Sequence, residues 1–228
     1  MKLLLIIPAF NEEENIVRVV ENIRQNYPLY DYVVINDGST DRTSSICHKN
    51  GYHIVDLPVN LGLAGAFQTG MKYAYYQKYD CAIQFDADGQ HRPEFIEAMR
   101  LELEKGYDLV IGSRFVTKKK PWSARMLGSR LITAAIRLST GHTIQDPTSG
   151  MRLYNSEVFK EFAANINYGP EPDTVSYLLK RGKKVSEVQV DMDERTAGES
   201  YLNFSKSAIY MLQMLISILL IQRVRRNR

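Results

Sequence analysis

Two carboxylates one residue apart, Asp86 and Asp88, stand at the end of an apolar run and just before a turn. The run 81–85 is typical of a buried strand, and Gly89 and Pro93 break its pattern. Because residues i and i+2 of a strand point the same way, the two carboxylates can converge on one cation. Mg²⁺ and Mn²⁺ prefer oxygen ligands and often take some from a substrate diphosphate. The pattern predicts half of a metal site, with a solvated acidic turn as the alternative.

The composition sets the bounds for this chemistry. The chain has 228 residues and a formal charge of +3, which fits one large domain, or a domain with an appendage, and indicates no nucleic-acid partner. The charge is unevenly distributed, because residues 109–145 contain no acidic residue. That segment holds Arg114, Lys118, Lys119, Lys120, Arg125, Arg130 and Arg137.

Neither the cysteines nor the N-terminus indicates export. Cys47 and Cys81 have no metal-ligand spacing, so they are expected to be buried thiols in a reducing compartment. The opening apolar run 3–7 is far shorter than the core of a signal peptide. The sequence therefore predicts a protein that stays on the cytoplasmic side.

Apolar strand-like runs alternate with helix-like segments along the first half. The strands are expected at 2–7, 32–36, 52–57, 81–85 and 108–112. Asn11 is a plausible N-cap for a helix that runs to about Asn26, and Thr40 or Asp41 could cap the next helix. This order predicts a mostly parallel sheet with helices on both faces. Ligands of such sheets bind beyond the carboxyl ends of the strands, where four side chains would gather: Pro8, Asp37, Asp86 and Asp88.

Five motifs in this half, in their order, resemble the nucleotide-sugar domain of glycosyltransferase family 2, and within it the dolichyl- or polyprenyl-phosphate sugar synthases. They are IPAFNE at 7–12, NDGSTD at 36–41, NLG at 60–62, DADGQ at 86–90 and GSR at 112–114. The resemblance continues with DPTSGMR at 146–152 and RTAGES at 195–200. The family commonly has a basic residue after that last serine, whereas Tyr201 and Leu202 follow here. The resemblance implies a GT-A-like domain over residues 1–203.

The resemblance also implies roles for particular residues. Asp86, Asp88 and Gln90 would hold Mg²⁺ or Mn²⁺, with Asp86 contacting the ribose or the metal's waters and Gln90 holding the metal or the diphosphate. The nucleotide-sugar would contact Pro8, Phe10, Glu12, Asp37, Gly65, Asp86, Ala87 and Asp88. The acceptor phosphate would be bound by Arg114, Arg130 and Arg195. Asp146 would join Asp86 and Asp88 in the catalytic set by orienting the acceptor or the sugar, although Asp146-Pro147 could instead be a plain turn.

The activity that follows is inverting transfer of one sugar from a nucleotide diphosphate-sugar to a polyprenyl phosphate lipid at the cytoplasmic face of the membrane. A lipid phosphate is already an anion, so positioning and charge neutralisation can suffice. A family 2 transferase acting on a saccharide or protein acceptor in cell-surface glycan synthesis is the alternative, and it would need a base such as Glu171 or Asp173. Glu171-Pro172-Asp173 could also be a helix N-terminus. A third alternative is a non-catalytic membrane partner of another transferase.

Two segments of the second half suit a membrane surface. A helix over 123–138 would place Arg130 and Arg137 on one face beside a large apolar complement, although a solvated basic face is the alternative. The apolar run 208–221 is shorter than the about 20 residues of a spanning helix and has a narrow polar stripe: Lys206, Tyr210, Gln213 and Ser217. Segment 204–228 is therefore expected to lie in the membrane interface or to pack on a partner. A short tilted span and a homo-oligomer paired through this helix are the alternatives.

Overall fold

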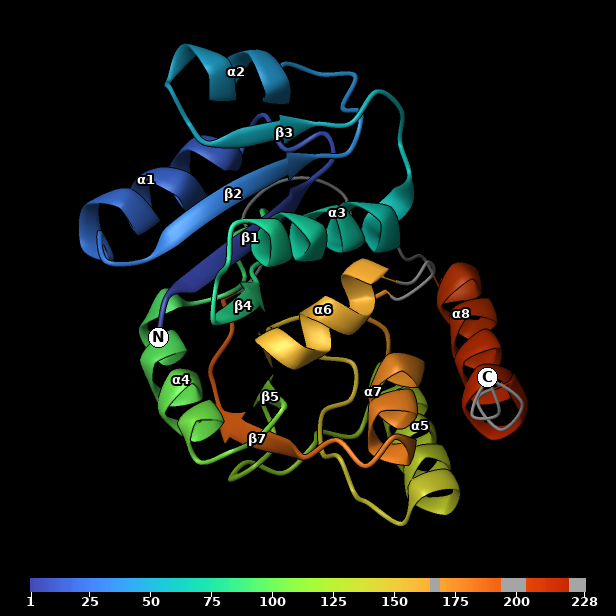
Figure 1. Ribbon diagram of the computed structural model, residues 1–228. Helices are drawn as coiled ribbons and strands as arrows, with labels where there is room; N and C mark the ends of the chain where they lie inside the picture. The colour runs from blue at the N-terminus through green and yellow to red at the C-terminus, as the bar shows by residue number, and fades with distance from the viewer. Residues whose placement is uncertain (165–168, 194–203, 222–228) are drawn as a thin grey trace.

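The computed structural model describes residues 1–164, 169–193 and 204–221, and its centre is a seven-stranded sheet (Figure 1). The strands are β1 Leu3–Ala9, β2 Asp31–Asn36, β3 Ile54–Asp56, β4 Cys81–Gln84, β5 Leu109–Ser113, β6 Arg152–Asn155 and β7 Val185–Gln189. They lie in the order β3-β2-β1-β4-β6-β5-β7. All neighbours are parallel except β6, which is antiparallel to β4 and to β5. The predicted mostly parallel sheet is confirmed.

Helices cover both faces of this sheet, as the sequence predicts. They are α1 Ile16–Asn26, α2 Thr43–Lys49, α3 Gly62–Tyr76, α4 Ile96–Glu104, α5 Ala124–Thr140, α6 Ser156–Ala164, α7 Pro172–Lys180 and α8 Phe204–Ile216. Alternate residues of β1 point to opposite faces, so Leu4 and Ile6 pack with α3, α5, α6 and α7, whereas Leu5 and Ile7 pack with α1 and α4. Two apolar cores therefore lie back to back across one sheet.

The strand register brings the chemistry-bearing loops to one edge. Ala9 at the end of β1 pairs with Asn36 at the end of β2, and Ile6 pairs with Gln84 at the end of β4. Strand β5 runs the same way as β4, so Ser113 ends at this edge too, and the reversed β6 begins there at Arg152. The loops after four parallel strands and the loop before β6 thus meet on one side of the sheet.

Helix α1 begins later than its sequence indicates. The expected N-cap, Asn11, has a φ of 55° and lies five residues before the first helical residue, Ile16. Its side-chain Oδ1 accepts hydrogen bonds from the backbone N–H groups of Thr40 at 2.9 Å and Asp41 at 3.4 Å. The prediction of an Asn11 cap was wrong because Asn11 stabilises the loop after β2 instead. At α2, Asp41 accepts from the first helical N–H, that of Thr43, at 2.9 Å.

The C-terminal segment packs on the domain. Helix α8 lies beside α5, and a single π-helical turn, Ser217–Ile221, continues it against α5 and α7 (Figure 1). None of the helices in the described ranges combines the length and the apolar character that crossing a membrane requires. Whether residues 1–203 and 204–228 behave as two separate units stays a prediction.

Candidate active site

The loop that follows β4 presents Asp86 and Asp88 at the edge where the strands end. Both side chains are partly exposed, and the side chain of Asp86 is 34% exposed. Oδ1 of Asp86 accepts from the side-chain amide of Gln84 at 2.9 Å, and Oδ1 of Asp88 accepts from the backbone N–H of Gln90 at 3.0 Å. These donors are uncharged, so they orient the carboxylates without neutralising their charge.

His91 fixes the backbone beneath this pair. Its ring is buried, and Nδ1 accepts from the backbone N–H of Asp86 at 2.9 Å. The ring proton is therefore on Nε2, which lies 3.5 Å from Oδ2 of Asp86. His91 is thus a buried, hydrogen-bonded histidine of this loop. Gly150 lies next to both Asp86 and His91, and a Cβ added there would meet Oδ2 of Asp86 at 2.8 Å and Nε2 of His91 at 3.4 Å. The loops 86–91 and 146–150 are therefore in direct contact.

The turn after β2 forms the neighbouring wall of the site. Asp37 is buried, and its Oδ1 accepts from the backbone N–H of Leu61 at 2.7 Å. Burial raises the pKa of Asp37, partly offset by hydrogen bonds from the backbone N–H groups of Leu61 and Gly62. Gly38 has a φ of +66°, and a Cβ there would meet the backbone N of Asn60 at 2.6 Å. Asp37 thus joins the loop after β2 to the start of α3.

The other residues expected around the nucleotide occupy the same edge or lie beside it. Pro8 lies in β1, Phe10 follows it with 40% exposure, and Ala87 is buried between the two aspartates. Glu12 accepts from the side-chain amide of Asn15 at 2.7 Å. Gly65 lies in the first turn of α3. That these residues contact a nucleotide-sugar stays a prediction.

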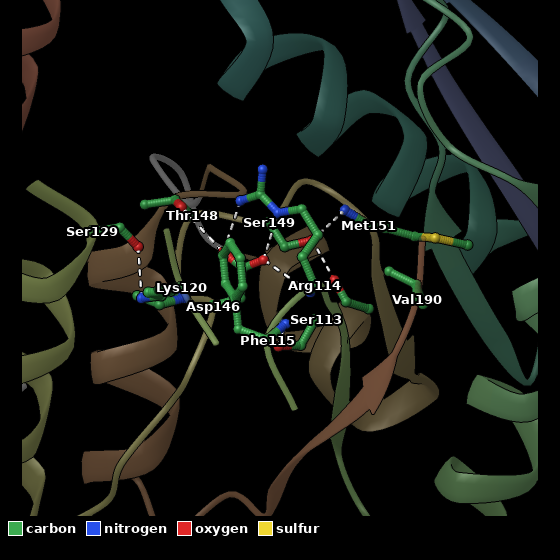
Figure 2. Close-up of polar contacts among 12 residues, drawn as sticks. Ser113, Arg114, Phe115, Lys120, Ser129, Asp146, Thr148, Ser149, Met151 and Val190 are labelled. Atoms are coloured by element: carbon green, nitrogen blue, oxygen red, sulfur yellow. Dashed lines mark hydrogen bonds and ion pairs between the residues drawn. The ribbon is translucent and has the colours of Figure 1, made fainter. Parts of the chain in front are cut away.

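A second carboxylate, Asp146, has a completely different environment (Figure 2). Its side chain is fully buried, and Arg114 donates to it from Nε at 2.7 Å and from Nη2 at 2.8 Å. The backbone N–H of Arg114 adds a third bond at 3.1 Å. Such a two-pronged guanidinium pair is the strong form of an ion pair. Asp146 is predicted to be catalytic and Arg114 to bind the acceptor phosphate, and the structure brings these two residues together. Their roles toward a substrate stay predictions.

Two further ionisable groups lie around this pair. Glu187 accepts from the backbone N–H groups of Gln145 at 2.6 Å and Asp146 at 2.8 Å, and burial raises its pKa. Lys120 donates to the hydroxyl of Ser129 at 2.9 Å, as Figure 2 shows, and burial lowers its pKa. Glu187 of β7 therefore fixes the segment at Asp146, and Ser129 of α5 holds Lys120 of the β5–α5 loop.

The buried residue that sequence reasoning missed is Arg152. It is 1% exposed and donates to three backbone carbonyls. Nε bonds to Ser149 at 2.9 Å, Nη2 to Pro147 at 2.7 Å and Nη1 to Glu171 at 3.0 Å. One side chain thus joins the 146–150 loop to the start of α7. The sequence feature that could have indicated it is an arginine at the start of a short strand-like stretch, Arg152–Asn155, directly after the turn-like segment 146–150.

Glu171 and Asp173, the candidate bases, are both hydrogen-bonded to the C-terminal segment. Glu171 is the N-cap residue of α7, as one of the two sequence interpretations had it, and it accepts from the hydroxyl of Tyr210. Asp173 accepts from the hydroxyl of Ser217 at 2.6 Å. Both donors belong to the predicted polar stripe, so Tyr210 and Ser217 face the domain, whereas Gln213 of the same stripe is exposed.

Arg130 lies beside a cationic hollow between the β5–α5 loop and α5. The hollow has a volume of about 530 Å³, and its lining includes Lys118, Lys119, Lys120, Trp122 and Arg130. Arg130 stacks on Trp122 with its Cζ 4.4 Å from the ring centre and donates to the carbonyl of Lys120 at 2.8 Å. The third expected phosphate ligand, Arg195, lies outside the described residues.

The acidic pair has the donor chemistry of a divalent-cation site. Asp86 and Asp88 are partly exposed carboxylates, Nε2 of His91 lies 3.5 Å from Asp86, and Gln90 adds an amide. Oxygen ligands of this kind suit Mg²⁺ and Mn²⁺. The described residues contain no group of three or more His, Cys, Asp or Glu side chains that could hold a metal ion. A cation here would therefore share its coordination with water and substrate oxygens, as is usual for Mg²⁺.

Comparison with known proteins agrees with this geometry. The model of the family described as "Glycosyl transferase family 2" matches residues 4–163, well over half of the chain. The chain belongs to this family. This family 2 glycosyltransferase is similar to the undecaprenyl-phosphate mannosyltransferase of Micrococcus luteus, with 30% identity over 89% of this chain and 88% of the relative. It is also similar to the UDP-N-acetylglucosamine–dolichyl-phosphate N-acetylglucosaminyltransferase of Methanococcus voltae, with 32% identity over 79% of each chain.

The fold of this family 2 glycosyltransferase also matches a solved structure. Glucosyl-3-phosphoglycerate synthase from Mycobacterium tuberculosis, in complex with Mn²⁺, UDP-glucose and phosphoglyceric acid, superposes with a TM-score of 0.70. The match covers 97% of this chain and 79% of that one at 20% identity, which is evidence for the fold alone. The expected GT-A-like fold and the resemblance to the polyprenyl-phosphate sugar synthases of family 2 are both confirmed.

Proposed function

We propose that this glycosyltransferase moves a single sugar from a nucleotide diphosphate-sugar to a polyprenyl phosphate at the cytoplasmic face of the membrane, with inversion at the anomeric carbon. The observation on which this depends is the placement of a partly exposed carboxylate pair and a cationic hollow near one edge of the sheet. The carboxylate pair suits the diphosphate of the donor, which it would bind through a cation. The cationic hollow suits an anionic acceptor. The names of the relatives, which act on undecaprenyl and dolichyl phosphates, support the same acceptor class.

On the donor side, Asp86, Asp88 and Gln90 would hold Mg²⁺ or Mn²⁺. When bound, the cation supplies Lewis-acid stabilisation of the charge that develops on the leaving diphosphate. The residues of this chain supply orientation. Gln84 and His91 hold Asp86 in place, and Asp37 joins the loop after β2 to α3, so the wall beside a bound nucleotide is fixed in advance.

On the acceptor side, the phosphate oxygen is the nucleophile and is already an anion at neutral pH. It has no proton to lose, so the site needs only to orient it and to reduce its repulsion from the donor diphosphate. Lys118, Lys119 and Arg130 around the hollow supply positive charge for this purpose. The carboxylates of Glu171 and Asp173 accept hydrogen bonds from α8, which supports a structural role for both.

A panel of radiolabelled UDP- and GDP-sugars tests the proposal. Each sugar is incubated with the purified chain and polyprenyl phosphate, with free saccharide, or with no acceptor, in Mg²⁺, Mn²⁺ or excess chelator. We expect label in the lipid phase with one donor, only with added metal, and only with polyprenyl phosphate. Transfer at full rate in excess chelator, or transfer to saccharide alone, would refute it.

Substitution of the candidate bases separates the two acceptor classes. Glu171→Gln and Asp173→Asn keep the size and the polarity of each side chain but cannot accept a proton at neutral pH. A transferase acting on a sugar hydroxyl would lose its chemical step, typically by a factor of about 10² to 10⁴. We expect kcat to change by less than about tenfold in each variant, because the acceptor phosphate has no proton to give up.

A further inference from the structure

One side chain of α1 reaches the loop that carries the acidic pair. Arg18 is exposed on this helix, and its Nη2 donates to the backbone carbonyl of Asp88 at 3.4 Å, across 70 positions of the chain. The same nitrogen donates to Oδ1 of Asn15 at 3.3 Å. No motif of the sequence includes Arg18, yet it contacts one of the three predicted cation ligands.

The guanidinium of Arg18 lies directly against Gly89. A Cβ at position 89 would meet Nη2 at 2.2 Å, Nη1 at 2.6 Å and Cζ at 2.7 Å. Because these three atoms belong to one planar group, that group covers the face of Gly89 where a side chain would stand. Gly89 also has a φ of +77°, a conformation that favours glycine. Two separate requirements therefore exclude a side chain at position 89: the backbone conformation and the arginine.

The turn that Arg18 covers separates two of the predicted cation ligands, Asp88 and Gln90. The glycine between them loses more backbone freedom on ordering than any other residue would. The cost of ordering such a turn would reduce the affinity for a cation, unless the turn is already held. On the Gln90 side, the N–H of Asp193 donates to the carbonyl of Gln90 at 3.0 Å. On the Asp88 side, the turn is held by Arg18.

Asn15 holds the arginine in place. Its side chain is buried, and the amide bonds at both ends: Oδ1 accepts from Arg18, and Nδ2 donates to Oε2 of Glu12 at 2.7 Å. A flipped amide would set its NH2 against the guanidinium and its oxygen against the carboxylate, so only one orientation satisfies both neighbours. Glu12 is one of the residues predicted to contact the nucleotide. A chain of bonds therefore runs from that wall of the site to the turn at 88–90.

From these contacts we propose that Arg18 is a positioning residue for the divalent cation, because it fixes the turn at 88–90 and so orders Asp88 and Gln90 before the cation binds. The inference rests on the proposed function in that these two residues bind the cation. The positive charge of Arg18 opposes this role, since it repels a nearby cation. Arg18 is exposed, so water and salt screen the repulsion, and we expect the ordering of the turn to outweigh it.

Binding of Mn²⁺ to the full chain tests this role without any transfer step. Free Mn²⁺ is followed by its electron paramagnetic resonance signal, with and without UDP or GDP. Arg18→Gln removes the charge, whereas Arg18→Lys keeps the charge but has no planar group to cover Gly89. We expect both variants to weaken Mn²⁺ binding by about tenfold, because the turn must then be ordered by the cation itself. Tighter binding in Arg18→Gln with unchanged binding in Arg18→Lys would show that only the charge matters and would overturn the inference.

A matched control on the same helix is Arg24→Gln. Arg24 is also exposed, and it donates to Glu21 at 3.1 Å rather than to the acidic loop. Its loss removes the same charge and should change Mn²⁺ binding by less than about twofold, because salt screens exposed charges. Circular dichroism and urea unfolding establish that each variant keeps its fold. Absence of Mn²⁺ binding by the unsubstituted chain would also overturn the inference.

A double-variant cycle tests the contact between Arg18 and Gly89. Gly89→Ala alone should weaken Mn²⁺ binding, since the new methyl group meets the guanidinium and the positive φ is strained. In an Arg18→Ala background only the strain remains, so the same change should cost less, by about fivefold in affinity. Additive effects on Mn²⁺ affinity would mean that the guanidinium does not cover Gly89.

Transfer assays on the same variants separate this inference from the proposed function. In Arg18→Gln the Mn²⁺ concentration for half-maximal transfer should rise about tenfold, whereas kcat at saturating Mn²⁺ should change by less than about threefold. Transfer by a chain whose Mn²⁺ binding is indifferent to Arg18 refutes the positioning role alone. Mn²⁺ binding that depends on Arg18, without transfer to any acceptor, refutes the proposed function alone.

Discussion

The two acidic sites at the carboxyl edge differ in how their charge is balanced. Asp86 and Asp88 are partly exposed and are oriented mainly by neutral donors. Asp146 is fully buried and has its own cation, Arg114, in a two-pronged pair. A buried carboxylate that is already paired with an arginine can position a loop, whereas partly exposed carboxylates remain accessible to a divalent cation. We expect the two acidic sites to serve different ends, and substitutions at and around them test this difference.

The largest effect is expected for the partly exposed pair, Asp86 and Asp88. Asp88→Ala should lower the rate of sugar transfer by at least about a hundredfold, because a lost metal ligand removes several kcal/mol of charge stabilisation. The free energy of unfolding should change little, since the side chain is partly exposed. Transfer assays and urea unfolding measure the two quantities, with exposed Glu157→Ala as the charge-matched control. Loss of stability as well as activity in this variant would mean that Asp88, like Asp146, has a structural role.

The opposite pattern is expected for the buried pair. Asp146→Asn should lower the free energy of unfolding by about 3 kcal/mol, because it leaves the Arg114 guanidinium without its counter-charge. Urea unfolding of this variant, of Arg114→Met and of the double variant forms a cycle. The double variant should be more stable than the sum of the single effects predicts, since it leaves no unpaired charge. Additive effects on the free energy of unfolding would mean that Arg114 and Asp146 do not stabilise each other.

A smaller effect is expected where α8 meets α7. Tyr210→Phe removes the hydroxyl that bonds Glu171 and should cost about 1.5 kcal/mol, the typical worth of a hydrogen bond to a charged group. Hydrogen exchange should then show faster opening of α8 than of the central strands. Tyr76→Phe, at a 71% exposed tyrosine on α3, is the control and should change neither quantity. Uniform loss of protection across the chain would contradict a local role.

The smallest effect is a pH dependence at Glu187. Its folded-state pKa is raised above the ordinary 4.5 by burial, so the native state keeps a proton that the unfolded chain has lost. Its ionisation therefore costs stability as the pH rises from 4.5 through the folded pKa. Glu187→Gln has no such cost, so its stability deficit relative to the unsubstituted protein should shrink over that range. Glu157→Gln should give a pH-independent difference, and a deficit at Glu187 that grows with pH would contradict the assignment.

The difference between the two sites also separates what the sequence could predict from what it could not. The Asp86 site depends on a strand of apolar residues, a turn and a spacing of two, all of which are local patterns. The pair of Arg114 and Asp146 joins residues 32 apart, and no local pattern specifies it. The one available signal was an aspartate that ends a long segment rich in cations and free of acids. A lone acid in that position has few choices of partner other than one of those cations.

The remaining differences have the same physical origin. The predicted strands of the first half exist, but the reversed strand β6 and the edge strand β7 were not anticipated, because strand pairing is a long-range choice. Asn11 has the composition of a helix cap, and tertiary bonds to Thr40 and Asp41 override that preference. The polar stripe was visible as a pattern, yet the bonds of Tyr210 and Ser217 to Glu171 and Asp173, which are distant in sequence, were not.

The absence of a side chain at Gly150 has a consequence for how the binding of the two substrates is linked. A methyl group there would stand 2.8 Å from Oδ2 of Asp86, so the two loops touch with no spare clearance. A displacement of Asp86 when the donor binds would also displace the turn at 147–150. Arg152 bonds this turn to Glu171, and Glu171 accepts a hydrogen bond from Tyr210 of α8. Occupancy by the nucleotide and seating of the lipid would then be thermodynamically linked, each changing the affinity for the other by the same factor.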